Sequence, residues 1–209
     1  MREDVPVAAK GERSETGTAA KVLDVAERLL QTRGYNGFSY ADVAAELKIT
    51  KASLHYHFAG KAELGEALIE RYATRFLDAL AAIDTSPTEA LAKLDAYAKL
   101  YADVLRGKRM CLCGMLAAEY QTLPKPMRNS VIRFFDENEA WLEKVLMQGQ
   151  EEGTLEFTGT AKDAARLIVS SLEGAMLVAR PYGDLARFQV AADRLLSSLA
   201  SQAPMELSR

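Results

Sequence analysis

Apolar residues recur at intervals of three and four along most of the chain, which is the spacing of amphipathic helices. In the first third this pattern predicts a helix from Lys21 to about Gly34, short helices capped by Ser39 and Thr50, and a fourth helix that opens at Lys61. It then predicts five further helices, over about 87–106, 110–120, 127–152, 160–180 and 184–201. No run alternates for long enough to indicate a strand. The pattern therefore predicts an all-α fold, and residues 1–15, which lack a period, are expected to form a disordered arm.

The segment 39–61, SYADVAAELKITKASLHYHFAGK, has the pattern of a helix-turn-helix. Its first helix buries Val43 and Leu47, and Ile49 is the apolar residue of the turn. In the second helix, Leu54 and Phe58 stand four residues apart and face the core. Small and polar residues then point outward, which suits a helix that enters the major groove of DNA.

The distribution of charge supports this interpretation. The 209 residues carry a net charge of −3, which excludes a uniformly basic surface. Between Leu47 and Ala62, however, there are three lysines and no acid, and both histidines of the chain lie in the same segment. Such a local basic patch is typical of a surface that faces phosphates.

The N-terminal third, about residues 18–68, resembles the DNA-binding domain of TetR-family repressors. The residues that carry the resemblance are Gly34-Tyr35, Ser39, Asp42-Val43-Ala44, Ile49-Thr50-Lys51, Leu54, Tyr56, Phe58, Lys61 and Leu64. The resemblance implies a helix-turn-helix DNA-binding domain over 16–62 and a helical bundle for ligand binding and dimerisation over 63–209. It also implies that Thr50, Lys51, Ala52 and His55 face bases, and that Ser39, Tyr56, His57 and Lys61 contact phosphates. His55 replaces a tyrosine that is frequent in the family, so the base preference stays open.

The predicted long helix at 127–152 carries two apolar stripes. One stripe contains Val131, Phe135, Asn138, Leu142, Val145 and Gly149, and the other contains Phe134 and Trp141. Because a helix with two apolar stripes buries two faces, we expect a homodimer interface built from this helix and the helix at 160–180. The alternative is that both stripes are internal.

Large, soft side chains on the predicted bundle helices are candidates for a pocket that takes a small apolar inducer of unknown identity. They are Tyr97, Tyr101, Met110, Cys111, Met115, Phe134, Trp141, Leu172 and Met176. Core packing is the alternative for each of them. Cys111 follows Lys108 and Arg109 near a predicted helix start, and both features lower the pKa of a thiol, so Cys111 is also a possible thiol sensor.

These features define the expected function. We expect a dimeric regulator that binds a palindromic operator in double-stranded DNA and is released by a small ligand or by modification of a thiol. We expect no catalytic residues, no metal, no cofactor and no membrane span, because the histidines lie in the DNA-binding segment and no apolar run is long enough. Two cysteines form no disulfide framework, which favours a cytoplasmic protein. The alternatives are a transcriptional activator and a helical bundle that binds ligands or partners without regulating transcription.

Overall fold

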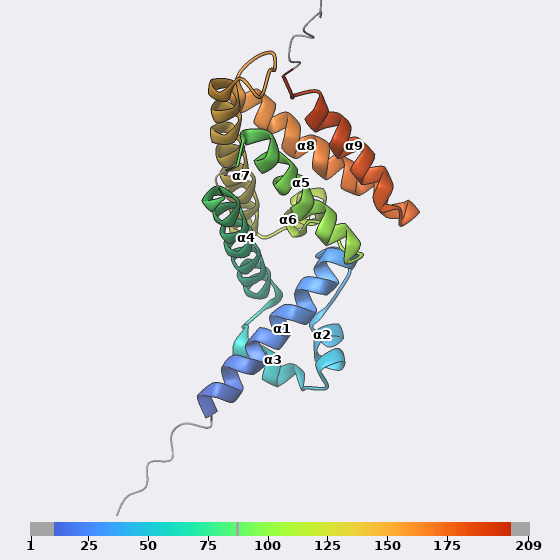
Figure 1. The fold of residues 1–209 in the computed structure, drawn as a ribbon. Helices are drawn as coiled ribbons and strands as arrows, with labels where there is room; N and C mark the ends of the chain where they lie inside the picture. The colour runs from blue at the N-terminus through green and yellow to red at the C-terminus, as the bar shows by residue number, and fades with distance from the viewer. Residues whose placement is uncertain (1–10, 87, 202–209) are drawn as a thin grey trace, which may run out of the picture.

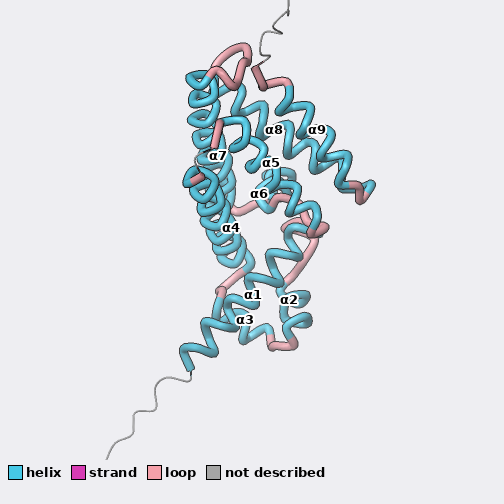
Figure 2. The backbone as a smooth tube through the Cα atoms, in the orientation of Figure 1, coloured by secondary structure: helices cyan, strands magenta, loops and turns pink. Residues whose placement is uncertain are grey.

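The computed structural model describes residues 11–86 and 88–201, and within these residues the chain forms helices and no strand (Figures 1 and 2). A small lower body contains α1 (Gly11–Arg33), α2 (Tyr40–Leu47) and α3 (Lys51–His57). The larger body contains α5 (Ala90–Arg106), α6 (Leu112–Ala118), α7 (Lys125–Glu152), α8 (Ala161–Ala179) and α9 (Leu185–Ser197), with short 3₁₀ turns at Tyr120–Thr122 and Arg180–Tyr182. The long helix α4 (Lys61–Thr85) rises from α3 into the larger body (Figure 1), so the two bodies share one continuous helix.

The observed elements follow the predicted order, and the all-α fold is confirmed. Local signals explain the agreement, because Ser39, Thr50 and Thr160 cap helices through their side-chain oxygens. The long helix α7 ends at Gly153, whose φ of 71° is left-handed.

Several boundaries differ from the predictions, and α9, for example, ends at Ser197 and not at about residue 201. Helix α1 already begins at Gly11, so residues 11–15 of the predicted arm are helical, while residues 1–10 lie outside the described part of the chain. Helix α5 begins at Ala90 and not at residue 87. A tertiary contact explains the later start, because the carboxylate of Glu152 on α7 accepts a hydrogen bond of 3.0 Å from the Ala90 N–H.

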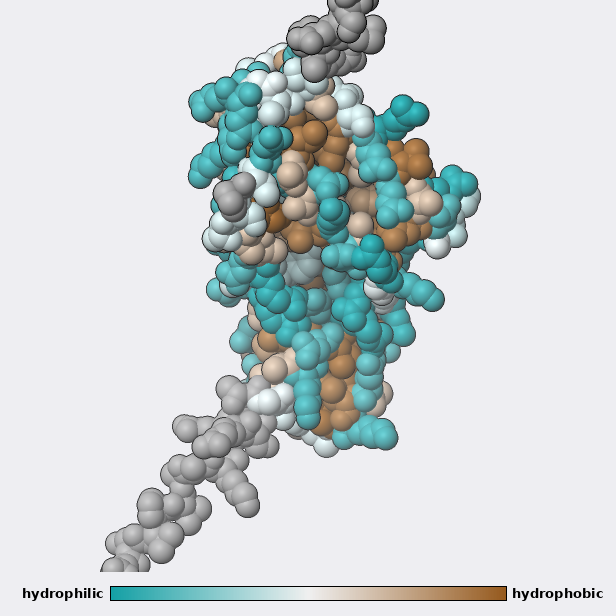
Figure 3. Space-filling model, in the orientation of Figure 1, coloured by the Kyte–Doolittle hydropathy of each residue, from teal (hydrophilic) through white to brown (hydrophobic). Residues whose placement is uncertain are grey.

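Helix α7 of the larger body packs against α4, α5 and α8. Val131, Phe134 and Leu142 are buried, and Trp141 is half-buried against the same core. Both predicted stripes therefore pack against the core of their own chain, which is the alternative named for them, while Ile132 and Met147 stay exposed on α7. Further large apolar side chains stay exposed on α8 and α9, and Figure 3 shows apolar surface on the α9 side of the larger body. They are Leu167, Leu177 and Val178 on α8 and Val190 on α9.

Candidate nucleic-acid interface and its junction with the bundle

Helix α2 is positioned by a reciprocal capping box. The Ser39 side chain accepts from the Asp42 N–H, and the Asp42 carboxylate accepts from the Ser39 N–H at 2.7 Å. The hydrogen bonds from Ser39 lower the pKa of the Asp42 carboxyl, so it stays ionised at the positive end of α2. This engagement gives the Ser39 hydroxyl a structural role in addition to its predicted contact with phosphate.

The turn and the cap of α3 then fix the second helix. Lys48 adopts a left-handed conformation with φ of 55°, which ends α2 and turns the chain. The Thr50 hydroxyl oxygen caps α3 by accepting from the Ser53 N–H at 3.1 Å. Leu54 is fully buried, and the Tyr40 hydroxyl donates to the Phe58 carbonyl oxygen at 3.0 Å, which ties the two helices together. The predicted helix-turn-helix is confirmed at each of these points.

The side chains predicted to face DNA lie mostly on the exposed side of α3. Lys51, Ala52 and His55 are exposed, Tyr56 is 72 % exposed, and His57 is half-buried. The Nδ1 of His55 lies 3.1 Å from the Ala59 carbonyl oxygen, which holds the ring and leaves Nε2 for a partner outside the chain. An exposed face with cationic and hydrogen-bonding groups and no acid is suited to contact DNA phosphates and base edges.

Lys61 has more partners inside the protein than the sequence indicates. Its ammonium donates to the carbonyl oxygen of Tyr35 at 2.5 Å and to that of Phe38, and it lies 4.5 Å from the centroids of both rings. Burial lowers the pKa of Lys61. Lys61 therefore holds the loop between α1 and α2, and contact with a phosphate is at most a second role.

We expect Lys61→Ala to lower the free energy of unfolding by about 1–2 kcal/mol, because two carbonyl oxygens lose a charged donor. If Lys61 also contacts a phosphate, the variant binds all DNA sequences more weakly and the salt dependence of its affinity is flatter. Denaturant unfolding and DNA titrations at several salt concentrations check both parts. Loss of affinity at a single base position would contradict the phosphate role.

The end of α1 and the following loop are fixed by groups from the larger body. The Glu119 carboxylate accepts from the backbone N–H groups of Tyr35, at 2.5 Å, and of Asn36. At Gly34, with φ of +85°, a Cβ would lie 2.8 Å from a Glu119 oxygen, so glycine is required there. Arg180 donates to the Thr32 carbonyl oxygen, where a cation favours the C-terminal end of the helix.

Nearer the start of α1, ion pairs around the buried carboxylate of Glu27 join the lower body to α4. The Glu27 carboxylate, whose side chain is 8 % exposed, contacts Arg71 at 2.7 Å and Arg75 at 2.6 Å. Arg71 also pairs with Asp24 at 2.8 Å. The DNA-binding body is therefore positioned by charged contacts with the bundle, and a change in the bundle can move it.

Seven of the nine residues predicted to line a pocket are buried in the core, and Met115 and Trp141 are half-buried. The Tyr97 hydroxyl donates to Asn138 at 3.1 Å and lies 3.0 Å from the Tyr101 hydroxyl, while its ring stacks on Trp141. Core packing, the alternative named for each residue, describes these contacts. None of the nine lines the cavity of about 420 Å³ that opens between α1, α4 and α5.

Cys111 stands at the N-terminal end of α6, as expected, and its sulfur accepts from the Gly114 N–H. Its environment nevertheless does not activate it. Burial and the neighbouring carboxyl of Glu173 raise the pKa of the Cys111 thiol, and Cys113 is shifted in the same direction. The prediction of a lowered thiol pKa is therefore wrong, because the cations that precede Cys111 in the sequence are not its dominant neighbours.

Burial also raises the pKa of Glu173 from 4.5 to about 7. The ionisation of Glu173 therefore costs no stability well below pH 4.5, where this carboxyl is protonated in folded and unfolded chains alike, and its cost grows as pH rises from about 4.5 to about 7. We expect Glu173→Gln to match the wild-type protein at about pH 4 and to be more stable by about 3 kcal/mol at pH 8. Denaturant unfolding at the two pH values measures this difference. The exposed Glu151→Gln is the control, and an equal effect of both variants would contradict the assignment.

Sequence reasoning missed the groups at the junction, above all Glu27, Gln31 and Arg109. The sequence held one sign of them. Glu27 and Gln31 are four residues apart and so lie on one face of a helix whose apolar residues are spaced for burial. Glu27 and Gln31 are both buried.

Comparisons with known proteins agree with this architecture. The family model for bacterial regulatory proteins of the tetR family matches residues 22–68, and the model for the tetracyclin repressor-like C-terminal domain matches residues 90–195. The chain belongs to this family of helix-turn-helix proteins and is a transcriptional regulator.

The similarity to individual relatives extends along most of the chain. A solved TetR-family regulator from Agrobacterium tumefaciens is 31 % identical, with a TM-score of 0.86 over 90 % of this chain and 100 % of that one. A TetR regulator from Legionella pneumophila is 32 % identical, with a TM-score of 0.76 over 86 % and 95 % of the two chains. The transcriptional repressor DhaR of Mycobacterium sp. strain GP1 is 23 % identical over 78 % of this chain and 83 % of its own.

Membrane-spanning helices and metal-binding groups can be assessed in the described residues, 11–86 and 88–201. None of their helices is long and apolar enough to cross a membrane. In the same residues, no three side chains of His, Cys, Asp or Glu form a group that could hold a metal ion.

Proposed function

We propose that the protein is a homodimeric repressor that binds a palindromic operator through α3 and leaves it when a small molecule binds. The exposed face of α3, with Lys51, His55 and Tyr56 and no acid, is the observation that supports DNA binding most directly. The similarity to DhaR, which is named a transcriptional repressor, supports repression over activation. The protein would act in the cytoplasm, where bacterial operators are found.

We propose that the dimer forms through α8 and α9. These helices expose Leu167, Leu177, Val178 and Val190, whereas the predicted stripes of α7 are covered. Two antiparallel helices from each subunit would bury this surface in a four-helix arrangement. Sedimentation should show a dimer at micromolar concentration, and a monomer there would contradict the proposal.

Among the two release signals expected from the sequence, a bound ligand is better supported than a modified thiol. Cys111 is 1 % exposed and its pKa is raised, so little reactive thiolate is present at neutral pH. A ligand in the larger body could shift α1 through the contacts of Glu119, Arg180 and Glu27, because these contacts join the two bodies directly.

Selection of genomic DNA fragments by the purified protein tests the proposed function. The experiment is done with sheared DNA of the source organism at near-physiological salt, because non-specific binding dominates at low salt. We expect enrichment of fragments that share one palindrome. Folded, dimeric protein that enriches no sequence would contradict a role as an operator-binding repressor.

A further inference from the structure

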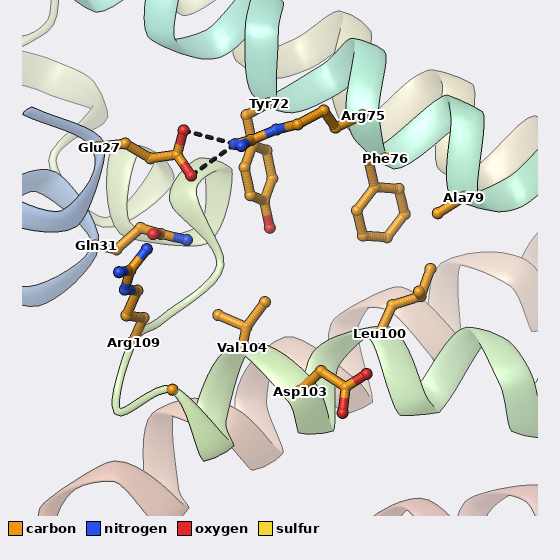
Figure 4. Close-up of a pocket in the computed structure, with 11 residues that line it drawn as sticks. Glu27, Gln31, Tyr72, Arg75, Phe76, Ala79, Leu100, Asp103, Val104 and Arg109 are labelled. Carbon is orange, nitrogen blue, oxygen red and sulfur yellow. Dashed lines mark hydrogen bonds and ion pairs between the residues drawn. The ribbon is translucent and has the colours of Figure 1, made fainter. Parts of the chain in front are cut away.

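A cavity of about 420 Å³ opens where α1, α4, α5 and the loop after α5 meet (Figure 4). Its wall along α4 and α5 is mostly apolar, with Arg75 and Asp103 as its charged members. The apolar part of this wall is formed by Tyr72, Phe76, Ala79, Leu100 and Val104. Cavities of this size hold small organic ligands, and an apolar wall with a few polar groups at one end is typical of such sites.

The polar end of the cavity contains an unsatisfied amide. Gln31 on α1 is 3 % exposed, its Oε1 has no hydrogen-bond partner, and its amide points into the cavity (Figure 4). A buried polar group without a partner destabilises the protein until a partner arrives. A ligand with an N–H or O–H donor at this place would give the Gln31 Oε1 a partner.

Arg109 adds an uncompensated positive charge beside this amide. Its guanidinium lies next to Gln31 in Figure 4, it is half-buried, and no carboxylate of the described residues pairs with it. The acids nearby are already engaged, since Glu27 pairs with Arg75 and Asp103 pairs with Arg106. A half-buried guanidinium without a counter-charge favours an anionic partner.

We propose that this cavity is the effector site and that it takes a small organic anion with an aromatic or aliphatic body. The anionic group binds Arg109, a neighbouring N–H or O–H group of the ligand donates to the Gln31 Oε1, and the body packs on Phe76 and Val104. This inference rests on the proposed function, because it assigns the site through which a ligand acts on DNA binding.

The position of the cavity explains how a bound ligand would change the placement of α3 and so the affinity for DNA. The Met110 N–H, next to Arg109, donates to the Gln31 carbonyl oxygen at 3.2 Å, and Arg75 at the rim holds Glu27 of α1. A ligand therefore contacts both bodies at once and favours one position of α1. By linkage, the ligand and the DNA then change each other's affinity by the same factor.

The test uses the fluorescent anion 1-anilinonaphthalene-8-sulfonate and its uncharged analogue N-phenyl-1-naphthylamine, which share one aromatic body. The variants are Arg109→Gln, the cavity-filling Val104→Phe, and Lys108→Gln as the control. Lys108 is an exposed cation of the same loop that does not line the cavity. Thermal melts and operator binding without dye show first that each variant is folded and binds DNA.

We expect the sulfonate to bind the wild-type protein and Lys108→Gln equally, and to bind Arg109→Gln about tenfold more weakly, which is about 1.4 kcal/mol. Arg109→Gln should leave the affinity for the uncharged analogue unchanged, and Val104→Phe should weaken both dyes. Saturating sulfonate should lower the DNA affinity of the wild-type protein and of Lys108→Gln. Three results would contradict the proposed site. They are absence of sulfonate binding, equal binding of the sulfonate to all three variants, and binding that leaves the DNA affinity unchanged. Failure of dye-free protein to bind DNA would instead contradict the proposed function.

Discussion

Replacing Glu27 with alanine is expected to lower the free energy of unfolding by about 3 kcal/mol. The Glu27 carboxylate is 8 % exposed and contacts both Arg71 and Arg75. Removing one partner of a buried ion pair leaves the other charge without compensation, which typically costs about 3–5 kcal/mol. The lower end applies here because Arg75 is 52 % exposed and can turn to water.

Asp24→Ala is the matched control for this prediction. Asp24 contacts the same Arg71 from the same helix, but its side chain is 68 % exposed. Such a surface pair contributes less than about 1 kcal/mol. Urea unfolding followed by circular dichroism measures both variants, and equal losses would show that burial of Glu27 does not decide the effect. Alanine has the higher helix propensity at both positions, so propensity cannot account for a loss.

The second large effect is expected on DNA affinity. Lys51→Ala should weaken binding to an enriched fragment by about a hundredfold, because a dimer loses the same contact twice at about 1–3 kcal/mol each. Lys51 is exposed in the first turn of α3, where it can reach a base edge or a phosphate. Titration of labelled DNA at fixed salt measures the change.

Lys162→Ala on α8 is the control, since it removes an exposed lysine far along the chain from α3. If Lys51 contacts bases, the loss is larger on the enriched fragment than on unrelated DNA. Equal affinities of Lys51→Ala and Lys162→Ala would contradict the placement of α3 at the interface.

Local signals made the helix-turn-helix predictable from the sequence. Ser39 and Thr50 cap helices through atoms three residues away, and Leu54 and Phe58 are four residues apart on one face. Each of these relations is contained in a short segment, so its geometry follows from helix periodicity alone. The same holds for most helical bounds of the bundle, but not for the end of α9 or for the start of α5, which depends on Glu152 of α7.

The junction and the cavity depend on contacts between distant segments. Glu119 and Arg180 contact the end of α1 across more than eighty residues of sequence. The periodicity of α7 shows two apolar stripes but not whether its own chain or a partner covers them. Cys111 shows the same limit, because burial and the carboxyl of Glu173, sixty-two positions later, raise the pKa of its thiol despite the adjacent cations.

The most direct test of the central claim is hydroxyl-radical footprinting of an enriched fragment with the purified wild-type protein. A dimer that places two copies of α3 in successive major grooves predicts two protected segments on one face of the duplex. Their centres should lie about 10 base pairs, or about 34–36 Å, apart or at a multiple of that spacing, and the protection should be symmetric about the palindrome. A single protected segment, or uniform protection without a preferred position, would contradict a dimeric operator-binding regulator.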